Sequence, residues 1–401
     1  MRAGQPRHHP TLAILCQDWA LHIGRTLAVA PFEASSGLER GHAGIALFLA
    51  ALAETTGDRA FEIAAGVRLR AAADATPTME PLLFSGSLGV AWVLELLGCD
   101  AEVNDATDAH VADVLECHDV RDRWELMYGL AGIGVYLLER PHSVKRTELL
   151  TWLVTLLDAV AHANANGVHW CSRLDPRFPD GLHQLGLAHG AAGVIVLLSR
   201  ILTETDVATP AVIRLLEGSV EALRASRLPE GNESLYPSAR ELRTSSALAW
   251  CQGDLSVAIA LAAAGDALRD PACLLEAREL AVMSALRGKQ SARVHDAGLC
   301  HGTIGLALMF QRLHDRFGDP VLADATTRWV ASTLQLRIPG QGVGDVRTWA
   351  AGTSCWVSDP GFLVGAAGVG LGLLAMIRDV DPGWDRALGL GVVKTVRRGL
   401  P

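Results

Sequence analysis

Aromatic residues are scarce in this sequence of 401 residues, at 5% of the chain, and charged residues make up only 20%. Half of the residues are apolar, and the chain also has 40 glycines beside an abundance of alanine and leucine. The apolar content is sufficient for a large core. The few large flat side chains argue against a β-sandwich, whereas the many small residues favour closely packed helices.

An excess of positive charge is also missing, because 44 acidic residues outnumber 35 basic ones and give a net charge of −9. The chain has no basic stripe with interleaved aromatic residues of the kind that binds nucleic acids. The composition therefore argues against nucleic acid as a main partner.

The sequence lacks an apolar segment after a basic start, so no signal peptide is expected. Its most apolar stretch, residues 362–377, is 16 residues long, whereas a membrane span needs roughly 20. A buried helix is expected there, and a cytoplasmic protein overall. Without a secretory signal, the eight cysteines do not predict a disulfide framework. Most are expected to be small buried side chains.

One pattern recurs seven times: a glycine, two residues, a second glycine and then an apolar run. The fifth copy has Ser256 in place of the second glycine. Successive first glycines lie 45, 43, 61, 63, 49 and 63 residues apart, which leaves room for two helices per repeat. The seven motifs are Gly41–Gly44, Gly86–Gly89, Gly129–Gly132, Gly190–Gly193, Gly253–Ser256, Gly302–Gly305 and Gly365–Gly368.

The apolar runs after the motifs carry almost no charge, which predicts helices that are buried nearly all round. The stretches between these runs are amphipathic, which predicts outer helices with one solvent-exposed face. They are residues 108–116, 146–161, 211–227 and 320–334. We therefore expect an all-α protein, an α/α toroid of seven inner and seven outer helices with the glycine turns at one end. The alternative, an open solenoid, would need polar capping repeats, which the chain lacks.

The organisation expected is one domain over residues 1–401, with repeats from about 41 to 375. The two longest connections, 163–187 and 228–249, contain proline, glycine, asparagine and aspartate. They are expected to be loops over the mouth of the toroid rather than linkers between domains.

Two soft-metal ligands, Cys300 and His301, are adjacent between glycines at the start of an apolar run. Neighbouring residues inside a helix diverge by about 100°, so both could reach one ion only from a turn. Cys251 stands two residues before Gly253 in the same setting. Two sulfurs and one imidazole leave a tetrahedral zinc one open position, which is typical of a catalytic site.

Two further turns carry titratable residues, His189 in the fourth repeat and Glu125 four residues before Gly129. Each of these site residues could have a purely structural role on its own. A cysteine before a buried helix can be a small apolar side chain, a histidine at a helix start can be a cap, and an acid can be solvated. His42, in the first turn, is interpreted as structural in this way. The coincidence of ligand types at equivalent repeat positions favours zinc, and convergence of the turns would bring these residues together.

Five segments carry a family resemblance that covers the chain from about residue 41 to 375: Trp250-Cys251-x-Gly253, Cys300-His301-Gly302, and residues 186–193, 128–133 and 362–368. Together they are similar to the signatures of the lanthionine synthetase C family, the lanthipeptide cyclases. The absence of a fused dehydratase or kinase-like domain resembles the stand-alone cyclases. The resemblance implies a dehydrated leader–core peptide as substrate, a separate dehydratase as partner, and a transporter complex that could hold the enzyme at the membrane.

The resemblance also implies that Cys251, Cys300 and His301 bind zinc, whose fourth position takes water and then a substrate thiol. A free thiol has a pKa near ~8.5, and zinc deprotonates it. The thiolate would add to dehydroalanine or dehydrobutyrine to form lanthionine or methyllanthionine. His189 matches the family's catalytic histidine, which would transfer the proton.

Three positions depart from the family pattern. Glu125 stands where an aspartate is usual, and Ala247 where an arginine is frequent, with Arg243 nearby. Residues 252–256 replace a more usual Tyr-Gly-x-Pro-Gly. The metal ligands are intact, so these departures affect proton transfer and enolate stabilisation.

Two other functions remain open. One is a thiol-activating zinc transferase, such as a protein prenyltransferase or a glutathione-adding relative of the cyclases. Prenyltransferases use Asp, Cys and His, however, and three tyrosines and eight phenylalanines are few for an isoprenoid cavity. The other is a non-catalytic peptide-binding scaffold, which the changes at Glu125 and Ala247 permit but the retained metal ligands disfavour.

Overall fold

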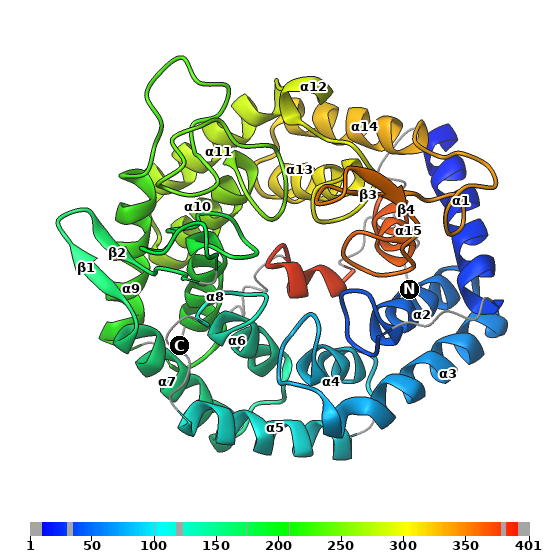
Figure 1. The fold of residues 1–401 in the computed structure, drawn as a ribbon, viewed down its shortest axis with the longest axis horizontal. Helices are drawn as coiled ribbons and strands as arrows, with labels where there is room; N and C mark the ends of the chain where they lie inside the picture. The colour runs from blue at the N-terminus through cyan, green and yellow to red at the C-terminus, as the bar shows by residue number, and fades with distance from the viewer. Residues whose placement is uncertain are drawn as a thin grey trace, which may run out of the picture. The chain divides into compact units, whose positions relative to one another are not determined.

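The computed structural model describes residues 10–29, 35–99, 101–117, 123–173, 175–207, 209–377 and 382–391. These residues are mostly helical, with two short hairpins (Figure 1). They form two compact units, one from residues up to 107, 248–250 and 285–384, the other from 108–247, 251–284 and the residues from 385 on. The organisation as one domain stays a prediction. Among the described residues, no helix is both long and apolar enough to span a bilayer.

In the first unit, α2 packs against α3 and α15, α1 packs against α15 and α2, and α13 packs against α14 (Figure 1). A hairpin of β3 and β4 pairs Thr348 with Val357 in antiparallel register. The elements are α1 (Pro10–Val29), α2 (His42–Thr56), α3 (Arg59–Ala75), η1 (Thr76–Thr78), α4 (Ser87–Leu96), α12 (Lys289–Ala292), α13 (Thr303–Phe317), α14 (Pro320–Leu334), β3 (Thr348–Ala350), β4 (Cys355–Val357) and α15 (Ala366–Ala375).

In the second unit, α8 packs against α6, α9 and α10, and β2 lies against α9. The hairpin of β1 and β2, which the sequence did not predict, pairs His162 with His169. Three elements, α5, α11 and η2, have residues in both units. The elements are α5 (Ala101–Glu116), α6 (Leu130–Glu139), α7 (Val144–Ala159), β1 (His162–Asn164), β2 (Gly167–His169), α8 (Ala191–Glu204), α9 (Pro210–Arg224), α10 (Asp254–Leu268), α11 (Pro271–Ala285) and η2 (Trp384–Leu388).

Each glycine motif starts a buried helix, as the repeat predicts. The first glycine is the residue before the helix, and the third helical residue is the second glycine, or Ser256 in α10. The helices that begin in this way are α2, α4, α6, α8, α10, α13 and α15.

The glycines are explained by how the preceding loop closes on the helix start. The first N–H groups of a helix have no intrahelical acceptor, and here they donate to carbonyls seven residues earlier. Leu130 N–H donates to the Arg123 carbonyl at 3.0 Å, and Thr303 N–H donates to that of Asp296 at 2.9 Å. The loop then lies so close that a Cβ at Gly129 or Gly305 would collide with loop backbone.

Within the first unit, backbone hydrogen bonds join four of the glycine turns and Trp250 in series. A backbone N–H of one turn donates to a carbonyl of the next, so these turns gather in one place as the repeat predicts. The bonds run from Glu39 to Phe84 (2.7 Å), Phe362 to Glu39 (2.8 Å), Leu299 to Leu363 (3.1 Å) and Trp250 to Cys300 (2.7 Å).

The four stretches predicted to be outer helices are helical, as α5, α7, α9 and α14. Their starts carry the expected capping signals. Side chains of Ser143, Thr209 and Asp319 accept backbone N–H groups of the first turn, and α9 and α14 have proline as their first residue. The α5 helix begins seven residues earlier than the predicted stretch, at 101 rather than 108.

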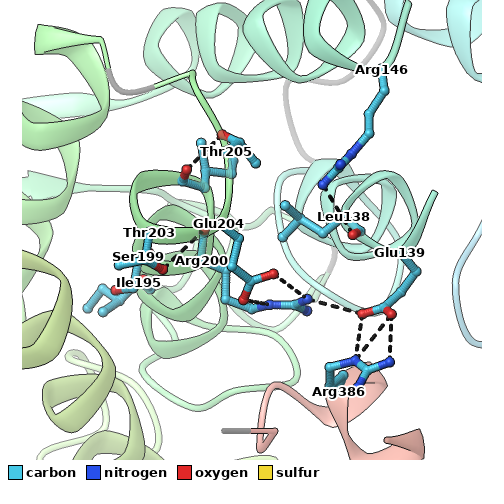
Figure 2. Close-up of polar contacts among 11 residues, drawn as sticks. Leu138, Glu139, Arg146, Ile195, Ser199, Arg200, Thr203, Glu204, Thr205 and Arg386 are labelled. Carbon is cyan, nitrogen blue, oxygen red and sulfur yellow. Dashed lines mark hydrogen bonds and ion pairs between the residues drawn. The ribbon is translucent and has the colours of Figure 1, made fainter. Parts of the chain in front are cut away.

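A buried ion network fastens η2 within the second unit (Figure 2). Glu139 at the end of α6 accepts from Arg200 of α8 at 3.0 Å and from Arg386 of η2 at 2.8 Å. Arg200 also contacts Glu204 at 2.9 Å. Burial by itself raises the Glu139 pKa, but the hydrogen bonds and charges of Arg386 and Arg200 outweigh it and leave the pKa lowered.

Replacing Glu139 with glutamine should therefore destabilise the protein, because it removes the carboxylate that pairs with Arg386 and one of the two carboxylates that pair with the buried Arg200. Breaking a buried ion pair costs about 3–5 kcal/mol. The folded-state pKa lies below the ordinary glutamate value of 4.5, so the contribution to stability is complete above that pH and is lost as the pH falls through the folded-state pKa. Urea unfolding of wild type and variant at pH 7, and at pH values below 4.5, measures both effects.

The matched control is Glu148→Gln, which removes an exposed carboxylate from α7 in the same unit. The control should unfold with a midpoint close to that of wild type. An equal loss in both variants at pH 7 would contradict a structural role for the Glu139 network.

Candidate active site

The turn before α13 presents Cys300 and His301 side by side. Asp296, which is fully buried, shapes this turn by accepting the Gly298 N–H at 3.1 Å. Cys300 is 9% exposed, and its own N–H donates to the Leu363 carbonyl at 2.9 Å. The turn thus places a thiol and an imidazole next to each other before the helix begins, as the sequence predicts.

The Trp250–Cys251 segment lies against this turn through backbone pairing. The Trp250 N–H donates to the Cys300 carbonyl at 2.7 Å, and the buried Trp250 ring packs against Phe84 at 5.6 Å. Cys251 follows by one peptide bond and is partly exposed. Gly253, two residues after Cys251, has a φ of 87°, a left-handed conformation that favours glycine.

The ligand atoms of Cys251, Cys300 and His301 lie within 4.8 Å of one another. Within the described residues this is the one such group of three or more metal-ligating side chains. Two sulfurs and one imidazole form a donor set that suits zinc. The three side chains predicted from the sequence are therefore brought together.

His301 itself fits the role of a metal ligand. Its Nε2 atom is buried, has no hydrogen-bond partner and lies 3.7 Å from Oδ2 of Asp296. Histidines that bind metals usually turn their second nitrogen toward a carboxylate, which orients the ring. Asp296 is placed to do this, and the sequence did not single it out because the signal is a contact rather than a motif.

Glu125 and His189 form a direct pair in the second unit. The Glu125 side chain is 2% exposed and accepts the N–H groups of Met127 at 2.9 Å and Tyr128 at 2.7 Å. Its Oε2 atom is 3.0 Å from Nδ1 of His189. Because an ionised carboxylate only accepts hydrogen bonds, this contact favours the tautomer of His189 that carries the proton on Nδ1.

The His189 ring is 36% exposed and stacks on Tyr128, with ring centroids 5.6 Å apart. Both rings line a pocket of about 340 Å³. The glycine at the start of the same turn, Gly186, lies against the Cys251 carbonyl so closely that a Cβ would collide with it. The pocket is lined by Glu125, Tyr128, Ser172, Asp175, Pro176, Leu182, Gln184 and His189.

Residues 252–256 of the fifth repeat, which depart from the family pattern, include a buried aspartate that anchors the preceding connection. Asp254, the first residue of α10, is buried, and its carboxylate accepts the N–H groups of Leu235 at 3.1 Å and Tyr236 at 2.8 Å. It thereby holds the 228–249 connection against the helix start. Arg243 is exposed in an irregular part of that connection, with a φ of 49°.

A family model for the lanthionine synthetase C-like proteins matches residues 33–388. The chain belongs to the lanthionine synthetase C-like family. The resemblance seen in the sequence motifs is therefore confirmed. No curated protein sequence matches the chain significantly.

Among solved structures, the chain is similar to nisin cyclase, with a TM-score of 0.74 and 18% identity over 95% of this chain and 96% of that one. The match confirms the predicted fold class, an all-α α/α toroid. Weaker matches are an inactive α-1,6-mannanase variant of Salegentibacter sp. (TM-score 0.46, 11% identity, 94% and 99% covered) and cellobiose 2-epimerase of Bacillus thermoamylovorans (0.44, 10%, 92% and 99%).

Proposed function

We propose that this member of the lanthionine synthetase C-like family is a zinc-dependent lanthipeptide cyclase. It would join cysteine thiols of a dehydrated precursor peptide to dehydroalanine or dehydrobutyrine in the same peptide. The observation that carries the proposal is the cluster of Cys251, Cys300 and His301, whose ligand atoms lie within 4.8 Å of one another in a chain of this family.

Cys251, Cys300 and His301 would hold the metal and leave one position for the substrate. When bound, zinc lowers the pKa of a thiol that takes this position and so supplies a thiolate nucleophile at neutral pH. Asp296, 3.7 Å from His301 Nε2, would keep the imidazole in its orientation. The partly exposed Cys251 and His301 leave the open position accessible to a peptide.

Ring closure is an isomerisation that conserves all atoms. The thiol loses its proton, the sulfur bonds to the β-carbon of the dehydro residue, and the π electrons move toward the α-carbon and its carbonyl. A proton then returns to the α-carbon and completes the thioether. The thiol proton passes to solvent. His189 would take up a proton from solvent at Nε2 and deliver it to the α-carbon, while the Glu125 contact at Nδ1 (3.0 Å) holds the ring in place.

Replacing Glu125 with glutamine should slow ring closure by roughly 10- to 100-fold, by analogy with the loss of a carboxylate that orients a metal-binding histidine. The glutamine amide can place an NH₂ group against Nδ1, which would then have to accept and would move the proton to Nε2. The kcat of peptide cyclisation checks this, with zinc content measured on the same samples.

The conservative variant Glu125→Asp serves as the control, because it restores the carboxylate and the residue type usual in the family. We expect it to recover most of the rate. An unchanged kcat in Glu125→Gln would exclude the carboxylate from the proton relay.

The proposal is tested with a synthetic peptide that contains one cysteine and one dehydroalanine. Cyclisation leaves the mass unchanged but removes the free thiol, so the product no longer reacts with a thiol-alkylating reagent. With added glutathione, a glutathione-adding enzyme would instead give a product heavier by one glutathione. Persistence of the alkylatable thiol at all enzyme concentrations would contradict the cyclase proposal.

The proposal extends to the partners that the family resemblance implies. A separate dehydratase would supply the dehydro residues, and the two enzymes would act on one leader–core peptide, alone or with a transporter. A pull-down of a dehydratase with this chain, in the presence and absence of the peptide, would test the association.

A further inference from the structure

Two tryptophans of the β3–β4 hairpin in the first unit, one partly exposed and one exposed, gather with His295. Trp349 of β3 lies edge-on to Trp356 of β4, with ring centroids 5.3 Å apart, and stacks on His295 at 5.5 Å. Trp356 is 40% exposed. We refer to His295, Trp349 and Trp356 as the aromatic platform. It is unexpected in a chain with only 5% aromatic residues, because five of the ten tryptophans are among its largest fully buried side chains.

The platform is fastened directly to the candidate metal turn. The Trp349 N–H donates to Oδ2 of Asp296 at 2.9 Å, and the same oxygen lies 3.7 Å from Nε2 of His301. The Thr348 hydroxyl donates to the Val364 carbonyl at 2.9 Å. These bonds fix the hairpin beside the ligands, so a peptide whose thiol reached the metal would lie within reach of the platform.

Arg347, the residue before β3, adds a positive charge to the platform. Its guanidinium group lies over the Trp356 ring, 4.5 Å from the centroid. Its Nε atom is buried without a hydrogen-bond partner, and no carboxylate of the described residues pairs with it. Arg337, in contrast, is paired with both Asp18 and Asp345 at 2.8 and 3.1 Å. A partly buried arginine without an anion is a strong candidate for an anion-binding group.

A small pocket opens beside this arginine. It measures about 80 Å³, enough for a short side chain, and combines apolar walls with the guanidinium group. The residues that line it are Trp19, Asp296, Ala297, Gln335, Leu336, Ile338, Val346, Arg347 and Trp356. Asp296 already accepts the N–H groups of Gly298 and Trp349, whereas the buried Nε of Arg347 on the same pocket has no hydrogen-bond partner.

We infer that Arg347 binds a carboxylate of the substrate peptide, whose chain lies across the aromatic platform. The inference rests on the proposed function for the identity of the ligand. A planar guanidinium group accepts a carboxylate through two parallel hydrogen bonds, and the Trp356 ring holds that plane in place by a cation–π contact. The carboxylate belongs either to an aspartate or glutamate side chain or to the peptide's own C-terminus.

The test uses three synthetic peptides with the same cysteine and dehydroalanine: one with glutamates flanking the cysteine, one with glutamines there, and the glutamate peptide with an amidated C-terminus. Each carries a fluorescent label, and its Kd is measured by anisotropy against wild type, Arg347→Gln and Arg316→Gln. Arg316 is a matched control, since it also lies over an aromatic ring, that of Phe317 at 5.5 Å.

Wild type and Arg316→Gln should bind the carboxylate form roughly tenfold or more tightly than the form that lacks it, as charged hydrogen bonds allow. This preference should disappear in Arg347→Gln. If wild type binds only the glutamine peptide more weakly, the carboxylate belongs to a side chain. If wild type binds only the amidated peptide more weakly, the carboxylate belongs to the C-terminus. A preference that persists in Arg347→Gln, or that is absent from wild type, would overturn the inference.

The same samples separate this inference from the proposed function. Zinc content and the loss of alkylatable thiol are measured beside Kd, and Arg347→Gln should keep the zinc and the kcat of wild type while KM rises. A wild-type protein that shows the Arg347-dependent preference without closing rings would refute the cyclase proposal alone.

Discussion

Replacing Cys300 with alanine should abolish ring formation and remove the bound zinc. The variant retains only two of the three proposed ligands, Cys251 and His301, and one thiol and one imidazole do not hold zinc firmly. A metal that activates a nucleophile contributes several kcal/mol to transition-state stabilisation, which corresponds to roughly a thousandfold or more in rate. The residual rate should approach that of the peptide without enzyme.

The control is Cys99→Ala, because Cys99 is an exposed cysteine of the same unit outside the cluster. It should close rings at the wild-type rate. A thermal melt of both variants separates loss of metal from loss of fold, since Cys300 is nearly buried. A Cys300→Ala enzyme that remains folded and active would refute the role of this thiol.

Replacing His189 with alanine should slow ring closure by about 10²- to 10⁴-fold, the usual contribution of general acid–base catalysis, while the zinc content stays unchanged. The ring is not part of the metal cluster and is held instead by Glu125 and by stacking on Tyr128. Single-turnover kinetics with the dehydroalanine peptide measure the chemical step directly. Solvent deuterium at the α-carbon of the product reports the proton transfer.

The matched control is His42→Ala, which removes the histidine from the equivalent turn of the first repeat. His42 contacts Arg68 at 3.4 Å rather than a carboxylate, and burial and Arg68 lower its pKa. This variant should close rings normally. Loss of zinc in His189→Ala would make His189 a metal ligand, and an unchanged rate would remove it from the proton relay.

The glycine turns and the site residues on them could be predicted because every turn has the same local backbone geometry. A loop that returns its carbonyls to the first N–H groups of a helix leaves no space for a Cβ at Gly129 or Gly305. Glycine spacing therefore records both the helix start and the turn geometry. The ligand types at Cys251 and Cys300 were readable for the same reason, since they occupy similar positions in repeated turns.

The surroundings of the site could not be predicted, because they depend on pairing between distant residues. Asp296 meets Trp349 across 53 positions, and Arg347 acquires its position from the β3–β4 hairpin. Strands of three residues carry too little periodicity to be recognised. Likewise, nothing near Glu139 in the sequence indicates that Arg386 completes its buried network across 247 positions.

The most direct test of the central claim is the zinc content of purified wild type and Cys300→Ala, measured together by elemental analysis. The account predicts that the wild type carries one zinc per chain, that Cys300→Ala carries none, and that both remain folded. Zinc retained at full stoichiometry in Cys300→Ala would contradict the ligand assignment. A folded wild type without zinc, even after incubation with the metal, would favour the non-catalytic scaffold.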